Sequence, residues 1–341
     1  MDYWYLFFLL AVFLFVYIRF SIPCARKYRR IQKLIDLESF ETAYELIEEL
    51  SLSKYGIFAG YSTTIIKKLI NLESFEAAYN LIEKIFQNKY AVLVGYPERL
   101  LPYRAFCLLN LSCYREAILV YDRIIKSFKR AAFKNKATLK YLSQLHSYKS
   151  YALRQLEEFE SSLACLDEAI KYQSDSPHIW YEKAYALSGL EKYWDSIVAC
   201  DRALKYQPEN CDIWFLKAYN FYMLEDNRNA TINCDLVLQN EPNYHMAWTQ
   251  KAMIAYRSGD YRKAITYCDR ALEIEPDDNY ALYGKACCYA LLEEIDLAID
   301  SIEQVIDLLP EFERELLDSN QDFSNLRQNP RFQVLLDRAT K

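Results

Sequence analysis

Ten cysteines and three histidines are the residues of this 341-residue chain best suited to metal or nucleophilic chemistry. Thiolate ligands of a structural zinc ion come in close pairs, typically C-x-x-C. No cysteine pair has that spacing here, and Cys287 and Cys288 are adjacent. Cys200, Cys234 and Cys268 recur at wide, regular intervals, so they cannot converge on one ion. We expect buried, reduced cysteines and no metal or cofactor.

The histidines also lack partners for catalysis. His146, His178 and His245 are scattered, and no serine, cysteine or carboxylate accompanies them at a repeating spacing. The six glycines are too dispersed to form a G-x-G-x-x-G or phosphate-binding loop. A net charge of -6 disfavours nucleic-acid binding, which requires a basic face. We therefore expect no enzyme, no small-molecule substrate and no nucleic-acid partner.

The strongest pattern in the sequence is an internal repeat of 34 residues. It reads WYEKAYALSGLEKYWDSIVACDRALKYQP from Trp180, WFLKAYNFYMLEDNRNATINCDLVLQNEP from Trp214 and WTQKAMIAYRSGDYRKAITYCDRALEIEP from Trp248. The repeats end at Pro208, Pro242, Pro276 and Pro310. Low glycine and proline counts, 6 and 9, agree with a helical chain. A solenoid built from helical hairpins is the predicted fold.

These residues resemble the tetratricopeptide repeat (TPR), which has a bulky residue at position 4, small residues at positions 8 and 20, and proline at 32. Position 8 holds Ala184, Ala218, Ala252 and Ala286, and position 20 holds Ser196, Ala230, Ala264 and Ala298. Small side chains there allow the two helices of a repeat to approach closely. The resemblance implies an all-α, right-handed superhelical solenoid whose first helices line a concave face.

At the same phase we expect about eight hairpins. Five occupy residues 143–312, one lies in 98–142 together with a basic insertion from Lys126 to Lys140, and two degenerate copies occupy 24–92. The insertion is either solvated or docks on lipid or an acidic partner. Residues 313–341 are expected to cap the array as short helices, and their D-F-x-x-L-R-x-x-P-R-F pattern is similar to the end of bacterial, especially cyanobacterial, TPR proteins.

The first 22 residues differ from the rest, because residues 3–22 are apolar except for Arg19. About 20 helical residues span the roughly 30 Å core of a bilayer. Basic residues follow without an acid up to Lys33, which predicts a single-pass anchor with the N-terminus outside and the repeats in the cytoplasm. A cleaved signal peptide is the competing interpretation, although Asp2 and the missing A-x-A site disfavour it. Cys24 is a candidate for acylation.

Opposite charges also recur in register. Position 7 is Lys149, Lys183, Lys217, Lys251 and Lys285, and position 25 is Asp167, Asp201, Asp235, Asp269 and Glu303. We expect these two columns to pair within or between repeats as a ladder. The alternative is that the lysines receive an anionic ligand.

Aromatic residues are concentrated at the first-helix positions that the family exposes on its concave face. The candidate protein-binding residues are Tyr151, Tyr181, Tyr185, Phe215, Tyr219, Tyr222, Met253, Tyr256 and Tyr283. Aromatic side chains dominate binding energy at protein interfaces, so this face is predicted to hold a peptide or helix of a client protein. Some family members clamp a carboxylate with Lys and Asn at positions where this chain has Tyr181, Tyr185 and Leu216. That clamp is missing.

The sequence thus favours a membrane-anchored scaffold or assembly factor that binds a client protein at the cytoplasmic side of a membrane. The alternative is a permanent, non-catalytic regulatory or structural subunit of a membrane complex. In both cases residues 3–22 would contact the membrane.

Overall fold

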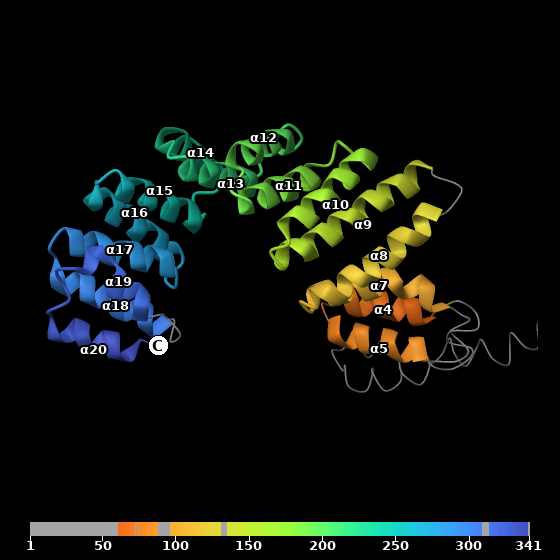
Figure 1. The fold of residues 1–341 in the computed structure, drawn as a ribbon, viewed down its shortest axis with the longest axis horizontal. Helices are drawn as coiled ribbons and strands as arrows, with labels where there is room; N and C mark the ends of the chain where they lie inside the picture. The colour runs from red at the N-terminus through yellow and green to blue at the C-terminus, as the bar shows by residue number, and fades with distance from the viewer. Residues whose placement is uncertain are drawn as a thin grey trace, which may run out of the picture. The chain divides into compact units, whose positions relative to one another are not determined.

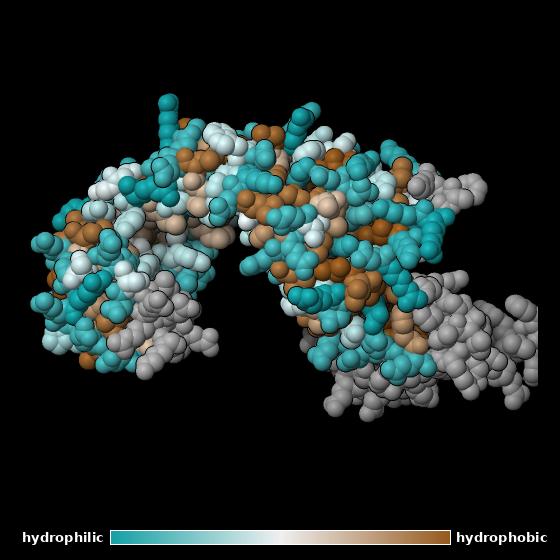
Figure 2. All heavy atoms as spheres, in the orientation of Figure 1, coloured by the Kyte–Doolittle hydropathy of each residue, from teal (hydrophilic) through white to brown (hydrophobic). Residues whose placement is uncertain are grey.

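The computed structural model describes residues 61–71, 73, 75–87, 96–130, 135–308 and 314–339. All regular elements within these ranges are helices, so the prediction of an all-α chain is confirmed (Figure 1). The chain divides into two compact units, Met1–Gln173 and Ser174–Lys341. In the view of Figure 2, hydrophilic residues cover much of the surface, and hydrophobic patches show among them.

The N-terminal unit contains three described hairpins. Their helices are α4 (Tyr61–Asn71) with α5 (Phe75–Gln87), α7 (Tyr96–Asn110) with α8 (Tyr114–Arg130), and α9 (Lys136–Gln155) with α10 (Phe159–Tyr172). The basic stretch expected as an insertion lengthens α8 and α9, which have 17 and 20 residues. The expected boundary between residues 98–142 and 143–312 therefore falls inside α9.

The C-terminal unit contains four hairpins and a cap. The hairpins are α11 (Pro177–Gly189) with α12 (Tyr193–Leu204), α13 (Cys211–Met223) with α14 (Asn227–Asn240), α15 (His245–Arg257) with α16 (Tyr261–Ile274), and α17 (Asn279–Leu291) with α18 (Ile295–Leu308). The cap is formed by α19 (Arg314–Ser319), the 3-10 helix η1 (Gln321–Phe323) and α20 (Pro330–Arg338). The cap is buried against α17 and α18 through the side chains of Phe323, Leu326, Phe332 and Leu335.

The expected transmembrane segment and the first degenerate repeat lie outside the described residues. Within the part of the chain that the structure describes, no helix combines the length and the apolar character needed to cross a bilayer.

A left-handed residue closes the first helix of most hairpins. Glu191, Glu225, Gly259 and Glu293 all have φ between 58° and 77°. The next amide reaches back five residues in each case, for example from Lys192 N–H to the Leu187 carbonyl at 2.9 Å. This is a Schellman motif, which ends the helix and turns the chain sharply. Only one of the four residues is glycine, although a left-handed conformation costs other residues about 1 kcal/mol.

The small residues at positions 8 and 20 lie where the two helices of each hairpin meet. All eight of them, from Ala184 to Ala298, are buried. Where position 20 is serine, its hydroxyl donates to the backbone carbonyl of position 8: Ser196 Oγ lies 2.6 Å from the Ala184 oxygen and Ser162 Oγ 3.0 Å from that of Ser150. Backbone and side chain are thus in direct contact. Cys200, Cys234 and Cys268 are also buried, as expected of core cysteines.

The two charged columns pair between neighbouring repeats. Lys217 Nζ lies 2.6 Å from Asp201, Lys251 the same distance from Asp235, and Lys285 2.7 Å from Asp269. Lys149 makes the same contact with Asp122 in the N-terminal unit. Each lysine thus bonds the aspartate of the preceding repeat, and the lysine side chains are only 12 to 23% exposed.

Tryptophan rings lie against the lysines of this ladder. Lys217 lies 5.2 Å from the ring centroid of Trp214, and Lys251 lies 5.3 Å from that of Trp248. The indole N–H of Trp214 donates to the Pro208 carbonyl at 2.8 Å, and Trp248 donates to Pro242. Each tryptophan therefore holds the turn between repeats and offers its ring to the lysine.

We predict that Asp201→Leu destabilises the protein by about 1 to 2 kcal/mol, because it leaves the largely buried Lys217 ammonium without its acceptor. The aspartate is more than half exposed, which limits the effect. Lys217→Met should have little effect, since the stem still packs. The double variant should recover most of the loss. Urea unfolding of the four proteins measures the free energies; no recovery in the double variant would mean that Asp201 acts independently of Lys217.

His146 takes position 4 in the repeat of α9 and α10, where the next three repeats have tryptophan. It is 6% exposed, and no described residue hydrogen-bonds to either ring nitrogen. Its ring lies 6.0 Å from that of Tyr172. Burial, with a further contribution from Lys129, lowers the pKa of His146 to about 4 from an ordinary value near 6.5. The folded protein therefore favours the neutral ring.

We predict that this histidine makes stability depend on pH. Its folded pKa is below its unfolded pKa, so its contribution is complete above pH 6.5 and is lost as the pH falls toward 4. Between pH 7.5 and pH 5 the loss should be about 2 kcal/mol. The measurement is urea unfolding at both pH values for wild type and His146→Phe. The difference between the two proteins removes the pH dependence of the carboxylates, which both proteins share. Equal pH dependence in the two proteins would contradict the assignment to His146.

Candidate functional site

The first helices of the C-terminal unit form one layer. Helix α13 contacts α11 and α15, and α15 contacts α17. Outward-facing residues of these four helices therefore share one surface, which we call the first-helix face. The predicted binding residues of this unit all lie on these helices.

Two exposed tyrosines mark the face at α11 and α13. Tyr185 is 41% exposed and Tyr219 36% exposed. Tyr185 contacts Tyr181 edge to face at 6.5 Å between ring centroids. Partial burial raises the pKa of Tyr219, and the neighbouring Tyr193 and Tyr185 contribute to this shift. Because α11 and α13 are in contact, Tyr185 and Tyr219 lie on adjacent helices of the first-helix face.

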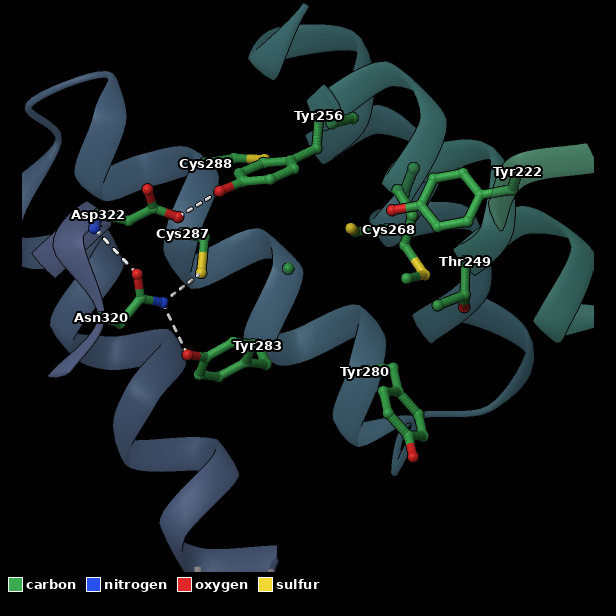
Figure 3. Close-up of a pocket in the computed structure, with 14 residues that line it drawn as sticks. Tyr222, Thr249, Tyr256, Cys268, Tyr280, Tyr283, Cys287, Cys288, Asn320 and Asp322 are labelled. Atoms are coloured by element: carbon green, nitrogen blue, oxygen red, sulfur yellow. Dashed lines mark hydrogen bonds between the residues drawn. The ribbon is translucent and has the colours of Figure 1, made fainter. Parts of the chain in front are cut away.

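A pocket of about 240 Å³ opens beside them, between α13, α15, α17 and the cap (Figure 3). Aromatic and sulfur-containing side chains make most of its wall. It is lined by Tyr222, Thr249, Ala252, Met253, Tyr256, Ala264, Cys268, Tyr280, Tyr283, Gly284, Cys287, Cys288, Asn320 and Asp322. Gly284 lies where a Cβ would come 3.7 Å from Cys268 Sγ.

The cap supplies the polar end of this pocket. The Tyr256 hydroxyl donates to Asp322 Oδ2 at 2.5 Å. Asn320 Nδ2 donates to the Tyr283 hydroxyl at 2.7 Å, and Asn320 Oδ1 accepts from the Asp322 amide at 2.9 Å. Figure 3 shows both hydroxyls directed at the cap. Burial, together with the bond to Asp322, raises the pKa of Tyr256, and burial raises that of Tyr283 to about 12. Both phenols are neutral at physiological pH.

The thiols of the pocket are neutral as well. Burial raises the pKa of Cys288 to about 12 and raises those of Cys268 and Cys287 strongly. A protonated, buried thiol behaves as a small apolar group rather than a nucleophile. No group of three metal-ligating side chains occurs among the described residues.

A histidine and an aspartate meet next to the pocket. His245 Nδ1 lies 3.0 Å from Asp278 Oδ2, which also accepts from the Thr249 hydroxyl at 2.7 Å. The other oxygen of Asp278 accepts from the Ala281 amide and caps α17. The Thr249 hydroxyl is thus bonded to the carboxylate and lies 3.3 Å from the backbone carbonyl of His245, so this cluster joins two repeats at a helix start and does not form a catalytic triad.

The structure gathers some of the predicted binding residues and separates others. Tyr222, Met253, Tyr256 and Tyr283 line the pocket. Phe215 is half-buried and packs on Tyr244 at 5.5 Å between ring centroids. Tyr151 belongs to the N-terminal unit, where it packs against the hydrophobic core beneath the Arg154 guanidinium. Phe215 and Tyr151 are held largely by packing within their own units.

Sequence reasoning did not identify Asn320 and Asp322 as residues of the pocket. Asn320 and Asp322 lie in the cap, and Asp322 meets a tyrosine 66 positions earlier in the chain. The local signal is the run of three polar residues, 320–322, before the buried Phe323. It suggests a helix start, which Asn320 does provide, but it does not show which residue the carboxylate contacts.

Comparison with known families identifies the hairpin at the centre of this site. The profile described as the tetratricopeptide repeat matches residues 245–278. This segment is a tetratricopeptide repeat. It comprises α15, the left-handed turn at Gly259 and α16, and it supplies six of the residues that line the pocket. The other hairpins of the C-terminal unit share its turn and its buried columns. No curated protein sequence matches the chain significantly.

Solved structures extend the likeness. A tetratricopeptide repeat protein from Parabacteroides merdae has a TM-score of 0.58 at 10% identity and covers 81% of this chain and 96% of its own. A thermophilic TPR protein from Thermus thermophilus has a TM-score of 0.45 at 15% identity, covering 57% and 98%. MamA from Desulfovibrio magneticus has a TM-score of 0.44 at 17% identity, covering 52% and 97%. At 10% identity, the Parabacteroides merdae structure shows a shared TPR-like solenoid fold and nothing more.

Proposed function

We propose that the chain is a protein-interaction scaffold whose first-helix face holds a peptide or helix of a client protein. The observation that carries the proposal is the continuity of exposed Tyr185 and Tyr219 with a tyrosine-lined pocket in one TPR array. Large, rigid aromatic side chains lose little conformational freedom on binding and supply most of the energy at interfaces.

We further propose that residues 3–22 anchor the scaffold in a membrane with its repeats on the cytoplasmic side. The support is the uncharged stretch from Tyr3 to Ile18 and the run of basic residues between Arg19 and Lys33. Such an anchor would hold a client at the membrane surface, where a scaffold or assembly factor brings components together.

The face is tested with peptides selected from a displayed library of random dodecapeptides on the full chain in detergent. We predict that Tyr185→Ala combined with Tyr219→Ala lowers the affinity for the selected peptides by roughly a hundredfold or more, because hot-spot aromatic residues contribute about 2 kcal/mol each to binding. Fluorescence anisotropy gives the dissociation constants. Circular dichroism should stay near wild type, because both side chains are exposed at this face.

Tyr206→Ala is the matched control. Tyr206 is 44% exposed but lies in the turn after α12, away from the first helices. Its loss should leave peptide binding unchanged. Full binding by the double variant would overturn the proposal, and unfolding of the double variant would show that the two tyrosines belong to the core.

For the anchor, we predict that protease added outside sealed cells or right-side-out vesicles leaves the repeats intact, while detergent exposes them to digestion. Removal of residues 1–22 should release a soluble helical protein. Cleavage of the repeats in intact cells would contradict the proposed orientation, and an insoluble truncated chain would contradict the separation of anchor and fold.

A further inference from the structure

The pocket beside the exposed tyrosines has the size of a side-chain pocket. Its volume of about 240 Å³ is below the range of roughly 300 to 1,000 Å³ that is usual for drug-sized ligands. The rings of Tyr222, Tyr256, Tyr280 and Tyr283 and the thioether of Met253 form its upper walls. Tyr280 is 72% exposed, so the pocket opens to solvent at that ring. An extended client segment on the first-helix face could therefore insert one long side chain.

A single charge lies in this pocket. Asp322 is the only acidic residue that lines it, and the lining contains no lysine, arginine or histidine among the described residues. The phenols and thiols are neutral, as shown above. Asp322 Oδ2 accepts from Tyr256, and the neutral Cys287 thiol is a further hydrogen-bond partner of this carboxylate. A half-buried carboxylate beside apolar walls, whose described side-chain partners are all neutral, is stabilised by a cation within hydrogen-bonding distance.

The carboxylate is held rigidly. Tyr256 fixes one of its oxygens, and the Asp322 amide is bonded to Asn320, which in turn donates to Tyr283 and contacts Cys287 Sγ at 3.5 Å. The next residue, Phe323, is fully buried and packs edge to face on Tyr283. Such preorganisation favours binding, because little side-chain entropy is lost when a partner arrives.

The combination of aromatic walls and a fixed carboxylate matches one kind of side chain. Lysine and arginine carry a long aliphatic stem that packs on apolar surface and a cation at its tip. Their cations are attracted to aromatic faces. Tyr222 shows this attraction within the chain, since the Arg257 guanidinium lies 3.5 Å from its ring centroid. A neutral apolar side chain would leave the charge of Asp322 without an opposite charge, and an acidic one would be repelled.

We propose that this pocket binds the side chain of a lysine or arginine in the client segment, with the stem against the tyrosine rings and the cation at Asp322. The inference rests on the proposed function and narrows the client to one that presents a basic residue within an otherwise apolar segment.

The test uses the peptides selected from the random dodecapeptide library. We expect lysine or arginine to be enriched at one position. For a lysine peptide, replacement of that lysine by norleucine, which keeps the stem without the amine, should weaken binding to wild type by about tenfold. Asp322→Asn should bind the lysine and norleucine peptides within about twofold of each other.

Three variants separate charge from structure. Asp318→Asn removes one charge from the same cap at an exposed residue outside the pocket, and it should keep the lysine preference. Tyr256→Phe removes the hydroxyl that ties down the cap but keeps the Asp322 charge, so it should also keep the preference. If Asp322→Asn lowers the melting temperature, Asp322→Glu gives the decisive result, since it should retain the preference.

The outcomes distinguish the two proposals. Two results would overturn the basic-pocket inference alone, in peptides whose binding is lost in the Tyr185→Ala, Tyr219→Ala variant. One is that the peptides show no enrichment of lysine or arginine. The other is that they keep the lysine preference when they bind Asp322→Asn. Loss of the preference in Tyr256→Phe as well as Asp322→Asn would also overturn it, because cap docking would then be responsible. Peptides that bind independently of Tyr185 and Tyr219 would contradict the proposed function itself.

Discussion

The close approach of two helices at a pair of small side chains is the constraint on which this fold depends. Ala184 faces Ser196 across one hairpin, and the serine hydroxyl reaches the alanine's own carbonyl. Dense packing at such a point leaves no room for a larger group. With the hairpin angle set there, the first helices must lie in one layer, and the tyrosines they carry must share a surface. In the hairpin of α15 and α16 the two small residues, Ala252 and Ala264, themselves line the pocket, so the pocket depends on the same close approach.

The cap completes the array by imitating the next repeat. Glu303 occupies the acidic column of the last hairpin, where a following repeat would supply a lysine. Arg338 takes that place, with Nη1 at 3.0 Å from Glu303 Oε1. Buried Phe323 and Phe332 cover the apolar face that another hairpin would otherwise cover. The segment that ends the stack also carries Asn320 and Asp322, so termination and the chemistry of the pocket are coupled.

Much of this arrangement could be predicted from the sequence, because the repeat fixes it locally. Small residues, core cysteines and the two charged columns recur at constant spacing, and their roles follow from their place on a helix. The exposure of the aromatic residues was harder to predict. Position alone does not show whether a ring packs inward, as Phe215 does on Tyr244, or stays exposed, as Tyr185 does. The cap residues could not be placed, because Asp322 meets Tyr256 only after two hairpins have stacked.

The pairing of Arg338 with Glu303 also bears on how such a chain changes length over evolution. The cap binds an acid at position 25 and covers an apolar end, and every hairpin of the C-terminal unit has an acid at that position. Duplication or loss of a whole hairpin upstream would therefore present the cap with a surface it already fits. The number of units, and with it the reach of the scaffold, can change while the terminal pocket keeps its carboxylate and its walls, provided that the last three hairpins are retained.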